Sequence, residues 1–251
     1  MIMGIITKSP REITIMREAG RVVAAVLERL AKEARPGITT AELDAVSVDE
    51  LAKHKAKASF KGYHGFPAHI CVSVNEEVVH GIPGKRVLKE GDIVSLDAGA
   101  IFQGLQGDAA ITVGIGKVSA KAQEVMDVAR GALDAGIAAG RPGGHLGDIS
   151  AAIQCYVESR GFSVVRQYSG HGIGYQMHED PSIPNFGEPG EGPVLIKGMT
   201  LALEPMVNVG GWETVVMPNQ WTVVTADGSL SAHFEHTIVI TDDGAEILTR
   251  L

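Results

Sequence analysis

Two segments of the sequence that lie 107 residues apart share an unusual arrangement of glycine, apolar residues and acid. The first, GDIVSLD, runs from Gly91 to Asp97, and the second, GMTLALE, runs from Gly198 to Glu204. In each, a carboxylate follows six positions after the glycine, inside an apolar stretch with the composition of a buried strand. A repeat of this length is too long for a solenoid unit and fits two similar halves packed around a pseudo-twofold axis.

The order of predicted elements also recurs along the chain. Ser9-Pro10 with Glu12 is typical of a helix N-terminus, and RPG closes a helical stretch both at Arg35 and at Arg141. We expect helices over about residues 10–34, 40–53, 120–139 and 147–160, and strands over 70–74, 78–80, 93–101, 109–113, 162–166, 200–207, 221–225 and 235–241. The sequence therefore predicts one α+β domain over residues 1–251, with pseudo-repeats at about 9–114 and 119–251.

Composition excludes several classes of protein. The chain has 251 residues, 45% of them hydrophobic, and a formal charge of −8, which argues against a nucleic-acid binder. It shows neither a secretory signal nor a run of roughly 18 uncharged apolar residues, so we expect a cytoplasmic protein without a membrane segment. Cys71 and Cys155 form no Cys-x-x-Cys pattern and suggest neither a disulfide framework nor a thiolate zinc site.

Four carboxylates occur in apolar segments that contain no arginine or lysine to match them. They are Asp97, Asp108, Glu204 and Glu235. A single buried acid is commonly paired with a cation, but clustered anions raise one another's pKa until they protonate. The glycines between Asp97 and Asp108 allow a bulged hairpin that points both carboxylates into one site. Divalent metal resolves the electrostatic conflict.

Histidines complete the predicted site. SGHGIG offers His171 as a nitrogen ligand, flanked by glycines that leave its ring accessible. Four carboxylates and one imidazole favour manganese, iron, cobalt or zinc over copper, and two such ions would balance four acids. His80 and His178, 98 residues apart, are interpreted as groups that donate to a substrate amide or stabilise an oxyanion. Neither a phosphate-binding loop nor a G-x-S-x-G elbow occurs.

The motifs together resemble those of a known enzyme family. GYHGFP, VNEEVVHGIP, GDIVSLDAGA, GLQGD, GHGIG, HEDP, MTLALEPMV and FEHTIVIT are similar, in order and spacing, to the signature segments of type I methionine aminopeptidases. The resemblance implies a pita-bread fold of the creatinase/aminopeptidase type, with two αβ halves around a curved antiparallel sheet. It also implies two divalent ions held by five ligands, which would be Asp97, Asp108, His171, Glu204 and Glu235.

Roles follow from the same resemblance. Asp108 and Glu235 would bridge the ions, and Glu204 would also move the proton of the activated water. His178 would contact the scissile carbonyl oxygen, and His80 the side of the amide nitrogen. The implied reaction removes the initiator methionine from nascent polypeptides when the next residue is small.

A methionine pocket should be compact and apolar. Tyr63, Phe66, Cys71 and Trp221 match the pocket positions of the family. The chain departs from the family pattern in three places: Phe60 stands where cysteine is common, Met177 where an aromatic is usual, and Ala109-Ala110, after Asp108, where threonine is usual. The first two would change pocket size, and the third predicts weaker occupancy of one metal site through loss of a hydroxyl.

Two other functions and one further partner remain open from the sequence. A proline-directed peptidase of the same fold would use similar ligands, although such relatives usually carry a large N-terminal domain. A non-catalytic binding protein would have lost ligands that this chain keeps. We expect a monomer. The basic residues Lys53, Lys55, Lys57 and Lys61 form either a solvated face or a patch that docks to the ribosome.

Overall fold

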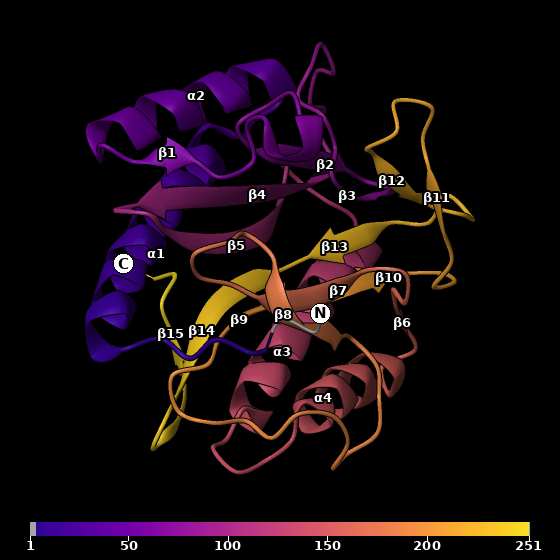
Figure 1. Ribbon diagram of the computed structural model, residues 1–251. Coiled ribbons are helices and arrows are strands. Elements are labelled where there is room, and N and C mark those ends of the chain that lie inside the picture. The colour runs from indigo at the N-terminus through magenta and orange to yellow at the C-terminus, as the bar shows by residue number, and fades with distance from the viewer. Residues whose placement is uncertain (1–3, 251) are drawn as a thin grey trace.

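A curled antiparallel sheet runs through the middle of the molecule, with two pairs of helices packed against it (Figure 1). The structure, a computed structural model, describes residues 4–250, so residues 1–3 and 251 of the predicted domain lie outside it. The helices are α1 (Pro10–Glu33), α2 (Thr40–Lys53), α3 (Ala120–Ala139) and α4 (Leu146–Glu158), with a short 3-10 turn, η1, at Tyr63–Gly65.

The main sheet has nine strands, in the order β1-β4-β5-β14-β9-β7-β8, with β2 paired to β4 and β15 paired to β14. Its members are β1 (Lys57–Ala58), β2 (Cys71–Val74), β4 (Ile93–Phe102), β5 (Leu105–Gly114), β7 (Ser169–Gly172), β8 (Glu179–Pro184), β9 (Thr200–Leu203), β14 (Glu235–Thr241) and β15 (Gly244–Ile247). Two smaller sheets contain β3 (Glu77–Val79), β6 (Ser163–Val164), β10 (Met206–Asn208), β11 (Thr214–Val216), β12 (Val223–Thr225) and β13 (Ser231–His233).

The predicted helix starts are confirmed. Ser9 and Thr39 each accept a hydrogen bond from the backbone N–H three residues on, and Glu12 and Glu42 bond back to the cap N–H. These capping boxes satisfy donors that a helix N-terminus would otherwise leave unpaired. All four predicted helices form within two residues of their expected ends.

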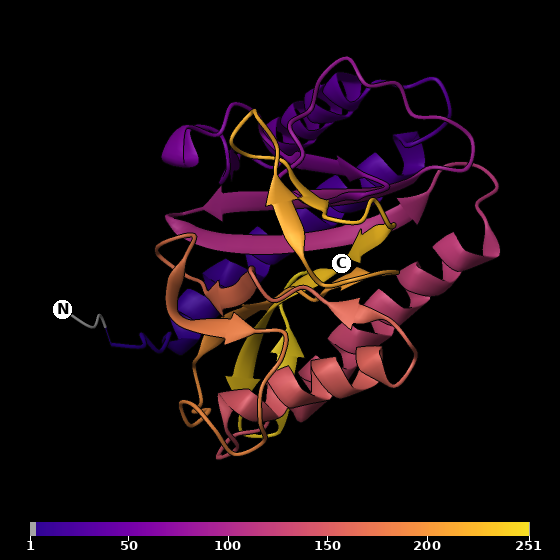
Figure 2. The same ribbon diagram turned by 90° about the vertical axis from the view of Figure 1, so that its right-hand side faces the viewer.

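The helices pack along the main sheet, α1 against β4 and β5, and α3 against β5, β9 and β14 (Figure 2). Leu96 and Ala98 of β4 pack into an apolar cluster with α1 and α2, whereas Ile238 and Ile240 of β14 pack with α3 and α4. Because strand side chains alternate between faces, Asp97 must point away from the helices. The alternation of these strands therefore brings acids onto one side of the sheet.

The hairpin that carries Asp97 and Asp108 is regular, not bulged as predicted. β4 and β5 pair without interruption from Ile93↔Gly114 to Phe102↔Leu105. The turn consists of Gln103 and Gly104, both with positive φ (48° and 84°), which suits the twist of a two-residue hairpin. Gly104 thus serves the turn rather than a bulge.

The predicted strand over 200–207 is also wrong as one element. It is divided into β9, which joins the main sheet, and β10, which pairs with β6 and β13. Pro205 interrupts the ladder because proline has no backbone N–H to donate. Glu204 therefore lies at the break between two sheets rather than inside a strand.

Six strands were not predicted, namely β1, β7, β8, β11, β13 and β15. Most are short or rich in glycine and polar residues, so they lack the apolar runs that identify strands in a sequence. None of the helices formed by residues 4–250 combines the length and apolar character needed to cross a membrane.

Candidate metal centre and substrate pocket

Five side chains from five separate segments meet on the open face of the main sheet. Asp97 comes from β4, Asp108 from β5, His171 from β7 and Glu235 from the first position of β14, while Glu204 follows β9. All five line one cavity. The structure thus brings together every residue that the sequence predicted as a metal ligand.

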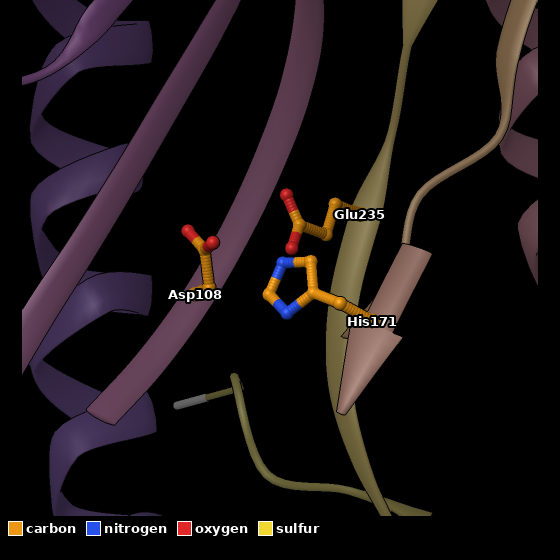
Figure 3. A group of neighbouring side chains, drawn as sticks. All are labelled: Asp108, His171 and Glu235. Carbon is orange, nitrogen blue, oxygen red and sulfur yellow. The ribbon is translucent and has the colours of Figure 1, made fainter. Parts of the chain in front are cut away.

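The centre of the cluster is tight (Figure 3). Asp108, His171 and Glu235 are buried, and each offers a ligand atom within 4.8 Å of those of the other two. Their side chains point toward one another from three different strands. The Nε2 atom of His171 lies 3.6 Å from Oε1 of Glu204. These spacings suit donors that surround a cation rather than groups that bond to one another.

The electrostatics of the acids favour a cation at this position. Burial raises the pKa of Asp97 to about 7. Burial also raises the pKa of Asp108, Glu204 and Glu235 well above the ordinary carboxyl value, and the charges of neighbouring acids raise it further. Among the described residues, no lysine or arginine forms an ion pair with any of the four, and the only basic side chains near them are His171 and His233. The acids therefore need positive charge from elsewhere in order to ionise together.

The donor atoms fit a divalent metal. Oδ1 of Asp97, Oδ1 of Asp108 and Oε1 of Glu235 are buried without a hydrogen-bond partner. Such oxygens are costly unless something binds them. The Nδ1 atom of His171 donates to the carbonyl of Gly172 at 2.8 Å, which leaves the Nε2 lone pair free for a ligand bond. Burial lowers the pKa of His171 to about 3, so its ring is neutral at physiological pH.

The glycines around His171 allow neighbouring segments of backbone to approach closely, rather than keeping the His171 ring accessible. A Cβ atom at Gly170 would meet the carbonyl oxygen of Ala202, and one at Gly172 would meet that of Asp180. Gly174 is packed against the side chain of Lys8. These contacts let β7 lie close to its neighbouring strands, which corrects the role predicted for the glycines.

His80 and His178 stand at the same cavity as the predicted ligands. Burial, followed by the charge of His178, lowers the pKa of His80 to about 4, and burial also lowers the pKa of His178. The hydroxyl of Tyr63 lies 2.7 Å from Nδ1 of His178. His80 has a positive φ of 59°, a strained conformation for a residue other than glycine. Both rings are thus uncharged near pH 7 and can donate hydrogen bonds.

An apolar pocket adjoins the acid cluster. The cavity has a volume of about 250 Å³, and its remaining walls are Phe60, Tyr63, His64, Phe66, Cys71, Met177 and Trp221. The rings of Phe66 and Trp221 meet edge to face with centroids 5.1 Å apart. All six residues predicted for the pocket are present, and His64 is an additional one. His64 lay within the GYHGFP motif, but no chemistry in the sequence singled it out.

Phe60 is held close to the sheet. A Cβ atom at Gly99 would lie 2.9 Å from Cε1 of Phe60 and 2.7 Å from Cβ of Ser59. Gly99 is therefore required for this close approach. Phe60 and Met177 belong to one apolar cluster and are both buried. The two departures from the family pattern thus belong to the same apolar cluster and line the same cavity.

Ala109 is turned away from the acids. It packs in the cluster formed with α1 and α2, on the opposite face of β5 from Asp108. Ala110, by contrast, lies opposite Asp97 of the neighbouring strand β4 and opposite Glu235 of the neighbouring strand β14. The predicted effect of a missing hydroxyl was therefore assigned to the wrong member of the Ala109-Ala110 pair.

His233 is a neighbour of the centre that sequence reasoning missed. Its Nε2 atom is buried, has no hydrogen-bond partner, and lies 3.9 Å from carboxylate oxygens of both Glu204 and Glu235. Burial lowers its pKa to about 3. Its position only two residues before Glu235 was the available signal, although β13 ends at His233 and β14 begins at Glu235.

Comparison with known proteins agrees with this arrangement. The sequence matches the profile of metallopeptidase family M24 over residues 14–242. It is 55% identical over 246 residues to a methionine aminopeptidase of Clostridium acetobutylicum, covering 98% of both chains. It is 53% identical to methionine aminopeptidase 1 of Bacillus subtilis, covering 98% of this chain and all of that one. The crystal structure of a methionine aminopeptidase from Thermotoga maritima superposes with a TM-score of 0.98 at 52% identity, covering 99% of this chain and 100% of that chain.

The fold and the acid cluster define a metal-dependent hydrolase with a pita-bread architecture, as the sequence motifs led us to expect. The chain belongs to metallopeptidase family M24.

Proposed function

We propose that this protein is a metalloaminopeptidase that removes the N-terminal methionine from newly made polypeptides when the next residue is small. The observation that carries the proposal is one cavity in which an unneutralised acid cluster adjoins an apolar pocket. The chain is 52–55% identical to three methionine aminopeptidases over 98–99% of its length, which supports the same activity.

The ligands would be Asp97, Asp108, His171, Glu204 and Glu235. When bound there, divalent ions would lower the pKa of a water and polarise the scissile carbonyl. We propose that these residues would hold two ions, with Asp108 and Glu235 shared between the two sites. Four carboxylates carry the charge that balances two dications. Cobalt, manganese, iron and zinc all suit this set of oxygen and imidazole donors.

Proton transfer is assigned to Glu204. Its carboxylate belongs to the cluster yet lies at the break between β9 and β10, where its side chain keeps a small exposed surface. A carboxylate whose pKa is raised can take a proton from the attacking water and give it to the leaving amine. Glu204 would thus serve as both acid and base.

The two neutral histidines would orient the peptide bond. His178, whose Nδ1 is bonded to the hydroxyl of Tyr63, would donate from Nε2 to the carbonyl oxygen. His80 would contact the amide nitrogen side. A protonated imidazole here would repel the ions, so the lowered pKa of both rings favours these roles.

Methionine selectivity is assigned to the apolar pocket. Aromatic edges at Phe66 and Trp221 and the sulfur atoms of Cys71 and Met177 suit a flexible thioether side chain. Phe60 and Tyr63 would close the remaining walls. A short, enclosed pocket would accept one unbranched side chain and leave the second residue of the substrate outside.

The test is a comparison of peptides under metal control. The metal-free protein, reconstituted with manganese, should release methionine from Met-Ala-Ser and leave Ala-Pro peptides intact. A proline-directed peptidase would show the opposite preference, and a non-catalytic binding protein would cleave neither. Treatment with a chelator should abolish release, and added manganese should restore it.

Cellular context is part of the proposal. We propose that the chain acts as a cytoplasmic monomer, on nascent chains, with no membrane or specific nucleic-acid partner. Lys53, Lys55, Lys57 and Lys61 are exposed, as a patch that docks to the ribosome requires, although Lys53 also pairs with Glu50. Cosedimentation with ribosomes should weaken when Lys53, Lys55 and Lys57 are changed to glutamate. Unchanged cosedimentation would remove this partner.

A further inference from the structure

A buried ion pair joins the segment before α1 to the loop that carries His178. Among residues 4–250, Lys8 is the only lysine or arginine that is buried, with 5% of its surface exposed. Its ammonium pairs with the carboxylate of Glu179, and only 1% and 6% of the two side chains are accessible. The two residues are 171 positions apart in the sequence. A buried pair this remote in sequence fixes one segment against the other.

Glu179 in turn closes the loop on itself. Its Oε1 atom accepts a hydrogen bond from the backbone N–H of Gln176 at 3.0 Å, while its Oε2 atom meets Lys8. The residues between Gln176 and Glu179 are Met177 and His178. The carboxylate therefore spans the two residues of this loop that line the substrate cavity.

The surroundings of Lys8 leave it little freedom. Its Nζ atom also donates to the carbonyl of Ile6 at 3.0 Å, and its backbone N–H donates to the carbonyl of Gly198 at 2.7 Å. A Cβ atom at Gly174 would collide with the Cε and Nζ atoms of Lys8. The side chain can reach Glu179 because position 174 carries no side chain.

The two ends of the loop differ in exposure. His178 lines the cavity and is exposed, whereas the side chains of Glu179 and Lys8 are buried. Apart from its bond to Tyr63, the ring of His178 meets the ring of His171 at a centroid distance of 4.3 Å. Both of these contacts require that the backbone present the ring at the right place.

We propose that Lys8 is a positioning residue: paired with Glu179, it fixes the loop that presents Met177 and His178 to the substrate. The inference rests on the proposed function, since it takes His178 to contact the substrate carbonyl. A misplacement of about 1 Å in a catalytic group can cost on the order of 100-fold in rate. Lys8 therefore affects catalysis although it touches neither substrate nor metal.

The test begins with Lys8→Met, which removes the cation and keeps the length of the side chain. We expect kcat for Met-Ala-Ser to fall about 10- to 100-fold, with KM changed less than about threefold. Manganese affinity should be unchanged, because no ligand is touched. Lys8→Arg, which keeps the charge, should restore at least part of kcat.

A second variant separates positioning from stability. Lys8→Met leaves a buried carboxylate unpaired and can lower the melting temperature, whereas Lys8→Met combined with Glu179→Met leaves no buried charge. Positioning predicts that this double variant melts at or above the wild-type temperature and still has low kcat. Recovery of kcat together with stability would overturn the proposal.

Arg17→Met is the matched control. Arg17 pairs with Glu246 at 2.8 Å and also ties α1 to a strand distant in sequence, but both side chains are half-exposed and neither lines the cavity. Its kcat should equal that of the wild type. An equal loss of kcat in Arg17→Met and Lys8→Met would overturn the positioning role.

A spectroscopic measurement judges the inference independently of activity. In protein labelled with carbon-13 at histidine, the ring signal of His178, assigned with His178→Asn, should shift or broaden in Lys8→Met but not in Arg17→Met. An unmoved signal would contradict the proposal. If the wild type releases no methionine, the proposed function fails, while this signal still decides whether Lys8 positions the ring.

Discussion

Asp97 and Asp108 lie diagonally across the β4–β5 ladder, on the same face of the sheet. Asp97 pairs with Ala110, and Asp108 pairs with Gly99. Two residues apart on a strand share a face, so the register places both carboxylates toward the cavity. Two like charges in this position are tolerated at neutral pH only with a cation between them.

Removing one carboxylate should therefore weaken metal binding more than it weakens the fold. We expect Asp108→Asn to lower manganese affinity at least about 100-fold. Mutating a residue that only hydrogen-bonds to a metal ligand typically lowers metal affinity about 10- to 100-fold, and loss of a ligand itself should cost at least as much. Isothermal titration of the metal-free protein measures this. Asp127→Asn, at an exposed residue of α3 that pairs with Arg130, is the control and should bind manganese like the wild type. Equal affinity of both variants would contradict the site.

The metal-free protein should lose stability as pH rises above about 6.5. The pKa of Asp97 is raised to about 7, and those of Asp108, Glu204 and Glu235 are raised well above the ordinary carboxyl value, so the folded state holds protons that the unfolded state has already released. Each such group contributes up to about 1.4 kcal/mol per pH unit. The buried histidines, whose pKa is lowered, have the opposite effect on stability. They act only below about pH 6.5, where histidines are protonated in the unfolded chain but not in the folded one.

Urea unfolding with a chelator present, at pH 6.5 and pH 8.5, measures this slope. Added manganese should stabilise the protein more at pH 8.5, because the metal requires ionised acids. Asp97→Asn should flatten the slope. Equal stability of the metal-free protein at the two pH values would show that the acids are not held protonated.

The regular hairpin register makes a distinct prediction for the two alanines. Ala110 lies between Asp97 and Glu235 in the ladder, so Ala110→Thr places a hydroxyl beside two predicted ligands and should tighten manganese binding up to about tenfold. Ala109→Thr buries a hydroxyl in an apolar cluster, which should cost about 1–3 kcal/mol of stability and leave manganese affinity unchanged. Titration of both variants decides between the two positions. The reverse pattern would contradict the strand register.

Phe60 should limit the length of the side chain that enters the pocket. Phe60→Cys removes a ring that lies against Gly99 and should raise the ratio of kcat/KM for ethionine over methionine substrates about tenfold, in line with about 1–3 kcal/mol per methylene. Peptides Eth-Ala-Ser and Met-Ala-Ser provide the comparison. Phe162→Cys, at a buried ring in the cluster with α3 and α4, should destabilise the protein without changing the ratio. An unchanged ratio in Phe60→Cys would remove Phe60 from the pocket.

The helices and the longest strands could be predicted because their signals are local. Capping boxes at Ser9 and Thr39 and the apolar run of β4 need only neighbouring residues for recognition. The strands β7 and β8 could not be predicted, since SGHG and EDPSIP carry no apolar alternation. They exist because the sheet supplies partners for their backbone groups, which is information from elsewhere in the chain.

The sequence was sufficient to predict which residues form the candidate site, but not how the strands place them in space. Unpaired acids in apolar segments revealed all four carboxylates, Asp97, Asp108, Glu204 and Glu235. The break at Pro205 and the facing of Ala109, by contrast, depend on pairing between strands. The role of Lys8 could not be predicted, because nothing near it in the sequence indicates a partner 171 residues away. The predicted duplication at about 9–114 and 119–251 stays a prediction.

The most direct test of the account is a titration of metal-free protein with manganese in the presence of Met-Ala-Ser, following methionine release and bound metal together. We expect no release without metal, and release that rises with occupancy and saturates at up to two ions per chain. Methionine release at full rate from the metal-free protein, or a folded protein that binds no manganese, would contradict it.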